Sequence, residues 1–340
     1  MTKMPPLAIT DALTLLATGD QRPLDPNGAL HINGTSAQMQ DTLGANDVFS
    51  VGPCSYRVVQ GLGQRLVPVL QPAARITRPV RLQAGLHKCL TMFQKRVYTA
   101  IGALTHSPHG AGAFVRRMRG RHIGYKHCFH AVRRFYKIAP RVGIASLSGQ
   151  AVDLDQFDDI RAVRFIRDPR DLLISGYYFH RRGAENINKI YGPKPGDFAE
   201  LNAGVPEGIA DDERFFNYLQ RVDMDVGLDA EMCFRAPHFL SMCAWAPDDP
   251  RVLTIRYEDF IGAEAASFHK IADHFEWSNQ ARDCALRMAT EFAQNKATVK
   301  TGHVRNKAPG QWRAHFSPER NAAFVAEWGD LLRAYDYPLD

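Results

Sequence analysis

The feature that most constrains the fold is a succession of strand, tight turn and helix that occurs three times along the chain. Short runs rich in Val, Leu, Ile and Phe are typical of buried strands, and apolar residues at helical spacing follow them. The predicted strands cover 80–86, 160–166 and 251–256, and the predicted helices cover 92–104, 169–180, a segment from about 258, and 319–333. This order predicts an α/β fold with a central parallel sheet flanked by helices.

Ligands of parallel sheets bind beyond the carboxyl ends of the strands, so the turns after residues 86 and 166 are the first places to inspect. The first turn contains Lys88, and Thr91 stands near the start of the next helix. The free N–H groups and partial positive charge of a helix N-terminus attract phosphate, and the lysine adds a full charge. A solvated lysine and a capping threonine in an ordinary turn are the alternative for this segment alone.

The second turn carries an arginine placed to face a ligand. Arg167 follows its strand directly, and Ser175 lies two helical turns further on, so that both can reach one anion. The planar guanidinium group of arginine matches phosphate oxygens. A surface cluster in which the arginine pairs with Asp168 and Asp171 is the alternative, and an acidic first turn would suit the helix dipole.

A third segment, 303–316, is a basic loop that contains a glycine and a tryptophan. Arg305, Asn306 and Lys307 precede Gly310, and glycine allows backbone to approach a ligand closely. A helix-capping sequence, Ser-Pro-Glu, follows at 317–319. A surface loop held by a buried tryptophan is the alternative for this segment.

Together these segments resemble the sulfotransferases that depend on 3′-phosphoadenosine-5′-phosphosulfate (PAPS). Residues 88–91 (Lys-Cys-Leu-Thr) resemble the family's 5′-phosphosulfate loop, usually Lys-Ser-Gly-Thr-Thr. Residues 167–175 resemble its 3′-phosphate motif, with an arginine and a serine eight positions later. Residues 305–312 resemble its C-terminal Arg-Lys-Gly-x-x-Gly-Asp-Trp loop, and Tyr-Glu-Asp at 257–259 resembles the end of a family strand. The resemblance covers roughly 80–340 and implies the P-loop-NTPase-like sulfotransferase fold.

The resemblance implies that a sulfuryl group moves from PAPS to a hydroxyl or amine of a small-molecule acceptor, with adenosine 3′,5′-bisphosphate as product and no metal. Lys88 would stabilise charge on the bridging oxygen of the leaving phosphate. The residues implied to bind the nucleotide are Lys88, Cys89, Leu90, Thr91, Met92, Arg167, Ser175, Arg305, Asn306 and Lys307. Several depart from the family pattern: Cys89 replaces serine, Leu90 replaces glycine, and Asn306 and Lys307 replace Lys-Gly. We therefore expect a loop that wraps the 5′-phosphate less closely.

A base must take the proton of the acceptor, and many members of the family use a histidine at a strand end after the first helix. His127 and His130 occupy this region, and histidine has a pKa near the working pH without any shift. We expect a strand over 122–126 whose carboxyl end faces the nucleotide motifs, with His127 favoured and His130 as its rival. Ordinary core or surface histidines are the alternative, and His180 and Glu185 are outside candidates.

Two other classes of protein fit parts of this pattern. A kinase-like P-loop phosphotransferase also has a lysine between strand and helix, but its loop needs Gly-x-x-x-x-Gly-Lys-Ser/Thr, and no serine or threonine follows Lys88 directly. A non-catalytic relative that kept the nucleotide site would fit the altered Leu90 and Lys307. Transfer of label from PAPS rather than ATP would exclude the phosphotransferase. Turnover of any acceptor would exclude the non-catalytic relative.

Composition limits the remaining choices. With 42 Lys and Arg against 36 Asp and Glu, the net charge of +6 suits an anionic ligand, but the basic residues are too dispersed to predict a nucleic-acid partner. Six cysteines without CxxC spacing and no apolar run of about 18 residues predict a cytoplasmic protein with reduced thiols and no membrane partner. We assign 79–340 to a sulfotransferase domain and 1–78 to an N-terminal extension of unclear role, in which 65–70 is expected to form a strand with an edge proline.

Overall fold

The computed structural model describes residues 7–8, 30–38, 41–51, 54–86, 88–105, 116–118, 121–123, 132–183, 190–194, 197–198, 203–294 and 308–340. Its strands are β1 (Leu7–Ala8), β2 (Leu30–Ile32), β3 (Thr35–Ser36), β4 (Thr42–Leu43), β5 (Val48–Val51), β6 (Cys54–Gln60), β7 (Leu66–Leu70), β8 (Val80–Gly85), β9 (Arg116–Met118), β10 (Arg121–Ile123), β11 (Ala145–Ser148), β12 (Ile160–Ile166) and β13 (Val252–Arg256). Its α-helices are α2 (Thr91–Thr105), α3 (Val132–Ile138), α4 (Pro169–Arg181), α5 (Phe215–Arg221), α6 (Met224–Cys243), α7 (Tyr257–Phe260), α8 (Glu264–His274), α9 (Asn279–Gln294) and α10 (Pro318–Ala334). Short 3₁₀ helices are η1 (Leu62–Gln64), η3 (Ala139–Arg141), η4 (Leu154–Gln156) and η8 (Gln311–Ala314).

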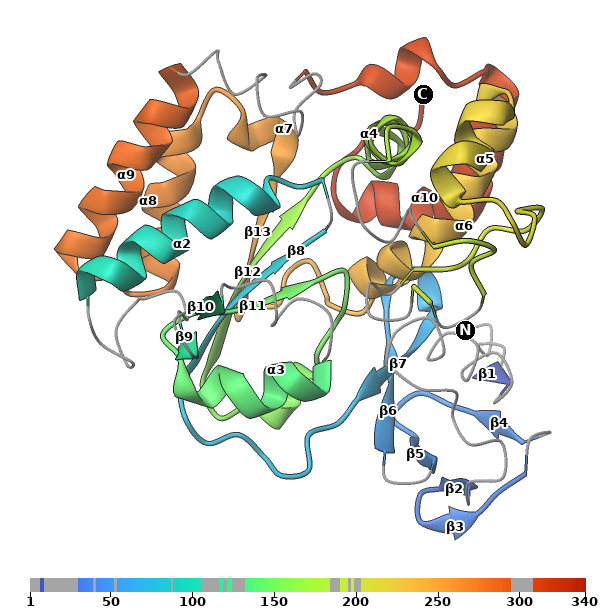
Figure 1. Ribbon diagram of the computed structural model, residues 1–340. Coiled ribbons are helices and arrows are strands. Elements are labelled where there is room, and N and C mark those ends of the chain that lie inside the picture. The colour runs from blue at the N-terminus through green and yellow to red at the C-terminus, as the bar shows by residue number, and fades with distance from the viewer. Residues whose placement is uncertain are drawn as a thin grey trace.

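A four-stranded parallel sheet forms the centre of the molecule and confirms the predicted α/β fold. Its strand order is β11-β8-β12-β13, and every neighbouring pair is parallel. Figure 1 shows α2, α8 and α9 together on one side of this sheet and α3 on the other. Because both faces are covered, six of the seven residues of β12 are buried, as expected for an interior parallel strand. The carboxyl ends of β8 and β12 therefore lie side by side.

Most of the predicted elements are confirmed within one or two residues. Helix α4 begins at Pro169 as expected, and the side chain of Asp168 caps it by accepting a hydrogen bond from the backbone N–H of Arg170. The helix expected from residue 258 is instead divided into the single turn α7 and the longer α8. Gly262, with φ +91°, lies between them, and this left-handed backbone conformation ends a helix.

Of the strand expected over 122–126, the structure describes only residues 122–123, which belong to β10 and not to the central sheet; its expected carboxyl end lies outside the described residues. Strand β10 pairs with β9 in a separate antiparallel pair, and the strand beside β8 is β11. The arginine-rich sequence of β9 and β10 explains the difference, because an interior parallel strand is buried on both faces and charged side chains fit there poorly. The apolar segment Ile144 to Leu147 meets this condition and is buried.

The N-terminal part of the chain folds into an antiparallel sheet of order β3-β2-β5-β6-β7. Strand β7 is an edge strand and carries Pro68, as predicted. Phe49 and Tyr56 of this sheet belong to the same buried cluster as Val80 and Leu82 of β8. Residues on both sides of position 78 thus share one core, while the domain boundary at that position stays a prediction. Within the described residues, no helix combines the length and apolar character that crossing a bilayer requires.

Candidate functional site

The turn between β8 and α2 has an unusual backbone. Lys88 has φ +73° and Leu90 has φ +59°, whereas Cys89 between them is not left-handed. Alternation of this kind forms a concavity of backbone N–H groups that binds anions. The left-handed Leu90 also explains why glycine is usual at the corresponding position of the resembling family, because glycine adopts this conformation without a steric cost.

A buried polar network holds this turn against the sheet. Gln94 of α2 donates to the carbonyl oxygen of Cys89 at 2.9 Å and accepts a hydrogen bond from Gln83 of β8. Ser146 of β11 donates to Gln83 Oε1 at 2.6 Å. These hydrogen bonds connect two strands, a helix and the turn, so the position of the turn is set by the sheet rather than by solvent-exposed loop contacts.

The side chains of the turn differ in what they offer to a ligand. Burial raises the pKa of the Cys89 thiol to about 12, so this group stays protonated and only its backbone can serve a phosphate. The hydroxyl of Thr91 donates to the carbonyl oxygen of Leu86 at 3.2 Å, and Met92 is exposed. The first N–H groups of α2 have no acceptor within the helix and provide the remaining donors.

Arg167 lies at the carboxyl end of β12 and is almost fully buried. Its Nη2 donates to Asp171 Oδ2 at 3.1 Å, and its guanidinium group lies 4.4 Å from the centre of the Tyr257 ring. The Nε atom of Arg167 is buried and has no hydrogen-bond partner among the described residues. A buried donor without a partner is costly, and an anion at this position would remove the cost.

Asp171 joins the second segment of the sequence to the third. Its Oδ2 accepts the backbone N–H of Gly310 at 2.8 Å, and its Oδ1 accepts that of Trp312 at 2.9 Å. Asp171 is fully buried, so the predicted pairing with Arg167 is real but is not a surface cluster. The tryptophan is buried as well and stacks on Arg170. The segment that directly follows residues 305–307 is therefore attached to the start of α4.

The Tyr-Glu-Asp segment after β13 supports the same corner. Glu258 accepts hydrogen bonds from the backbone N–H of Asp168 at 3.0 Å and from the Tyr337 hydroxyl at 3.1 Å. Burial raises the pKa of Glu258, and it also raises the pKa of Asp168 although Arg170 opposes the shift. Both carboxyl groups hold backbone and neighbouring side chains in place, which is a structural use of buried polar groups.

One face of helix α4 carries or contacts residues from the predicted segments. Arg167 precedes the helix, and Asp171, Ser175 and Phe179 follow at intervals of four residues, so they lie along one side. The ammonium group of Lys88 lies 3.6 Å from the centre of the Phe179 ring. The fold thus brings Lys88, from the first predicted segment, to the same helix face as Arg167 and Ser175 from the second.

Several predicted site residues lie outside the described residues. They are His127, His130, Glu185, Arg305, Asn306 and Lys307. His180 is described and fully buried, with its Nδ1 2.6 Å from Glu231 Oε2 and its ring among the rings of Phe215 and Phe234.

Sequence reasoning missed a histidine at the carboxyl edge of the sheet. His238 of α6 is buried beside Gly149, where an added Cβ would lie 2.7 Å from its Nε2. Gly149 directly follows β11, and its N–H donates to the carbonyl oxygen of Gly85 at 3.0 Å. Nothing in the spacing of the sequence connects His238 to β11, because the contact joins residues far apart in the chain.

Comparison with known proteins identifies the family of the chain. The sulfotransferase domain family matches residues 156–332. The chain belongs to this family. The match to the sulfotransferase domain includes Arg167, Asp171, Ser175 and Trp312, whereas Lys88 lies before it. Membership makes the protein a transferase and confirms the sulfotransferase fold that the resemblance implied.

Solved sulfotransferase structures are similar over most of the chain at low identity. The mouse sulfotransferase SULT7A1, complexed with PAP, is 16% identical, with 76% of this chain and 85% of that chain covered and a TM-score of 0.41. Retinol dehydratase in complex with androsterone and the inactive cofactor PAP is 16% identical, with 84% and 89% covered and a TM-score of 0.38. No curated protein matches the sequence.

Proposed function

We propose that this sulfotransferase moves a sulfuryl group from PAPS to a hydroxyl or amine of a small molecule and releases adenosine 3′,5′-bisphosphate. The environment of Arg167 is the observation that supports this proposal. Its guanidinium group is buried, its Nε lacks a partner, and it lies on the same face as Ser175. A buried cation with an unused donor fits a phosphate group that completes its hydrogen bonds.

The other residues are assigned by their position around this arginine. The backbone of residues 88–92, comprising Lys88, Cys89, Leu90, Thr91 and Met92, would hold the 5′-phosphate in the anion-binding turn. Arg167 and Ser175 would hold the 3′-phosphate. Arg305, Asn306 and Lys307 are proposed to complete this part of the site, because the residues that follow them are attached to Asp171.

The proposed reaction is an in-line displacement at sulfur. The acceptor oxygen or nitrogen forms a bond to sulfur, the bond from sulfur to the bridging oxygen breaks, and that oxygen leaves with the nucleotide. Lys88 stabilises the negative charge that develops on the leaving oxygen. The acceptor proton passes to a base, for which His127 and His130 remain the proposed residues. This assignment is tested by the single and double His→Ala variants, and normal turnover in all three would exclude both histidines.

Nucleotide binding tests the donor assignment. We expect calorimetry to show tighter binding of adenosine 3′,5′-bisphosphate than of ATP, because ATP lacks the 3′-phosphate that Arg167 and Ser175 would contact. Arg167→Ala should lose most of this preference, since a charge-assisted hydrogen bond is worth about 1.5–3 kcal/mol. Arg282→Ala, at an exposed ion pair on α9, is the matched control and should keep it. Equal affinity for the two nucleotides in the wild type would refute the proposal.

The catalytic role of Lys88 has its own test. Lys88→Ala should lower the single-turnover rate with labelled PAPS by about 10²–10³, because it removes a cation aimed at charge that develops in the transition state. Binding of adenosine 3′,5′-bisphosphate should change far less. Lys270→Ala on the exposed surface of α8 is the control. Normal turnover with a raised requirement for PAPS would reduce Lys88 to a binding residue, and label accepted from ATP would point to a phosphotransferase.

A further inference from the structure

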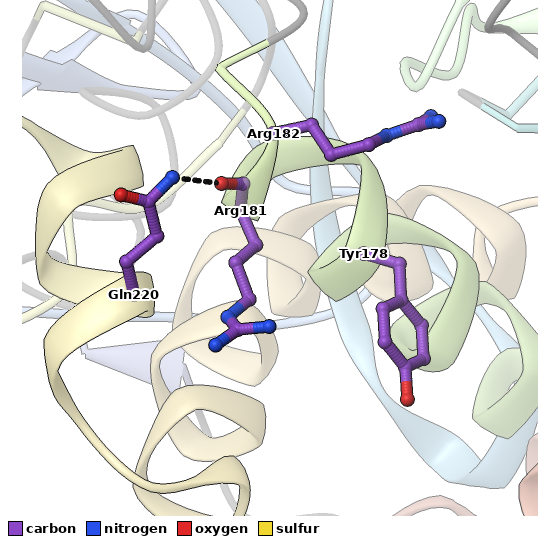
Figure 2. Close-up of a pocket in the computed structure, with 4 residues that line it drawn as sticks. All are labelled: Tyr178, Arg181, Arg182 and Gln220. Carbon is purple, nitrogen blue, oxygen red and sulfur yellow. Dashed lines mark hydrogen bonds between the residues drawn. The ribbon is translucent and has the colours of Figure 1, made fainter.

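A cavity of about 470 Å³ lies at the C-terminal end of α4. Tyr178, Arg181 and Arg182 of α4 and Gln220 of α5 line it (Figure 2). Gln220 Nε2 donates to the carbonyl oxygen of Arg181 at 2.8 Å, and Arg181 Nε donates to that of Leu219 at 3.1 Å. These two hydrogen bonds connect α4 to α5, so the cavity has a wall held by both helices.

The described lining of this cavity is positively charged. Two of its described lining residues are arginines, and none is acidic. Arg181 and Arg182 are exposed residues, and no described carboxylate forms an ion pair with either. Arg221 differs in this respect, because it follows Gln220 directly and pairs with Glu213 at 2.9 Å. Arg181 and Arg182 therefore retain donors for an anion from solution.

One arginine of the cavity lies near the proposed transfer lysine. The ring of Phe179 has the Lys88 ammonium group 3.6 Å from its centre and the Arg182 guanidinium group 5.9 Å from its centre. A single aromatic side chain thus separates the two cations. Arg182 and Lys88 are therefore close enough for the two ends of one small molecule to approach them.

We propose that the acceptor of this sulfotransferase carries an anionic group, such as a carboxylate, which Arg181 and Arg182 bind while the hydroxyl or amine at its other end receives the sulfuryl group. This inference rests on the proposed function and adds the chemical class of the acceptor. A guanidinium group favours a planar carboxylate over an uncharged amide of the same shape. The half-buried Tyr178 ring offers an apolar surface for the middle of such a molecule.

Matched probes test the charge preference directly. The probes are 4-hydroxybenzoate and 4-hydroxybenzamide, and the longer pair 3-(4-hydroxyphenyl)propanoate and its amide. Calorimetry measures their binding to the full-length protein saturated with adenosine 3′,5′-bisphosphate. We expect at least one carboxylate to bind about tenfold or more tightly than its amide, as charge-assisted hydrogen bonds to a guanidinium group would produce.

Variants show whether Arg181 and Arg182 cause the preference for carboxylates. The double variant Arg181→Gln, Arg182→Gln should lose the preference while its affinity for adenosine 3′,5′-bisphosphate and its circular dichroism spectrum stay unchanged. Arg221→Gln, on the neighbouring helix but outside the cavity lining, should keep the preference. Equal or unmeasurable binding of both members in both pairs, or a preference that survives in the double variant, would overturn the inference.

Turnover with PAPS separates this inference from the proposed function. If the amides are sulfated as efficiently as the carboxylates, the protein is a PAPS-dependent sulfotransferase and the anionic acceptor class is wrong. If the carboxylates bind with the expected preference but no probe is sulfated, the cavity is confirmed as an anion site and the proposed transfer reaction loses its support.

Discussion

At the scale of single residues, left-handed backbone conformations shape the carboxyl edge of the central sheet. Lys88 and Leu90 accept this conformation although they carry side chains, which concentrates strain in the turn that we propose binds the 5′-phosphate. Gly149 adopts it at the end of the neighbouring strand, with φ +69°. Position 149 requires glycine for its conformation and also for space, because the His238 ring lies against the backbone there.

The crowding around Gly149 predicts that its substitution by alanine costs more stability than the same substitution at an uncrowded glycine. Gly149→Ala should lower the free energy of unfolding by about 2–5 kcal/mol, because a left-handed alanine is strained and its Cβ would overlap the buried His238 ring. Gly262→Ala shares a positive φ, +91°, but has open space around its Cβ, so it should cost only about 1 kcal/mol. Urea denaturation of both variants checks the prediction, and equal losses would show that the contact with His238 contributes nothing.

At the scale of elements, α4 organises the site. Its N-terminal turn holds Asp171, which connects Arg167 to the backbone of Gly310 and Trp312, and its later turns carry Ser175 and Phe179. One helix therefore contacts all three segments that the sequence singles out. Replacing a side chain on this helix should affect several parts of the site at once.

Asp171→Ala should be among the most harmful of such changes. It leaves the buried Arg167 without its counter-charge and two backbone N–H groups without an acceptor, so we expect a loss of about 3–5 kcal/mol in the free energy of unfolding. Asp171→Asn keeps an oxygen acceptor and should lose less stability but still weaken binding of adenosine 3′,5′-bisphosphate. Chemical denaturation and calorimetry measure the two effects, and a change below about 0.5 kcal/mol in the alanine variant would contradict the assigned role.

Ion pairs at the junction of the two large sheets make the stability of the protein depend on pH. Hydrogen bonding by Arg57 of β6 lowers the pKa of Asp155 in η4, and hydrogen bonding by Arg251 lowers that of Asp249. Both carboxyl groups hold their protons less tightly when folded than when unfolded. Their contribution to stability is therefore present above the ordinary aspartate pKa of 3.8 and is lost as the pH falls through the lower folded values.

Asp155→Asn tests this junction. Because Asp155 is largely exposed, we expect the variant to lose only about 0.5–1 kcal/mol at pH 7. Its stability should also fall less steeply than that of the wild type below about pH 4. Guanidinium-independent methods such as urea denaturation at several pH values give this comparison, and parallel pH profiles for the two proteins would refute it.

At the scale of the whole molecule, the N-terminal sheet and the central sheet depend on each other. They share a buried cluster that includes Phe49, Tyr56, Leu82 and Trp245. Arg65, just before β7, also stacks on Trp328 of α10 at 4.4 Å. The region 1–78, which has no visible chemistry in the sequence, therefore covers apolar surface of the part that carries the site.

Removal of residues 1–78 tests this dependence. The truncated protein should expose the apolar side chains of the shared cluster, with a loss comparable to several large-to-small core substitutions of about 2–5 kcal/mol each. We expect aggregation in sedimentation experiments and increased binding of a hydrophobic dye. A monomeric truncated protein with unchanged affinity for adenosine 3′,5′-bisphosphate would show that the N-terminal sheet is dispensable.

The sequence by itself determined three of the four central strands and the class of the protein. Strands β8 and β12 and helices α2 and α4 were predictable because their apolar periodicity and their proline and turn residues are local properties of the chain. Lys88, Arg167 and Ser175 were singled out because the segments around them resemble motifs of the sulfotransferase family. The assignment of these residues to the nucleotide stays a prediction.

Only the tertiary structure decided which strand lies beside β8, and which side chains surround the three segments. The place of β11 beside β8 depends on burial of both faces, which is a property of the assembled sheet. The contact of His238 with Gly149 and the attachment of Gly310 to Asp171 join residues far apart in sequence. Such contacts leave no periodic signal in the sequence, because packing selects partners by shape and distance in space rather than by spacing along the chain.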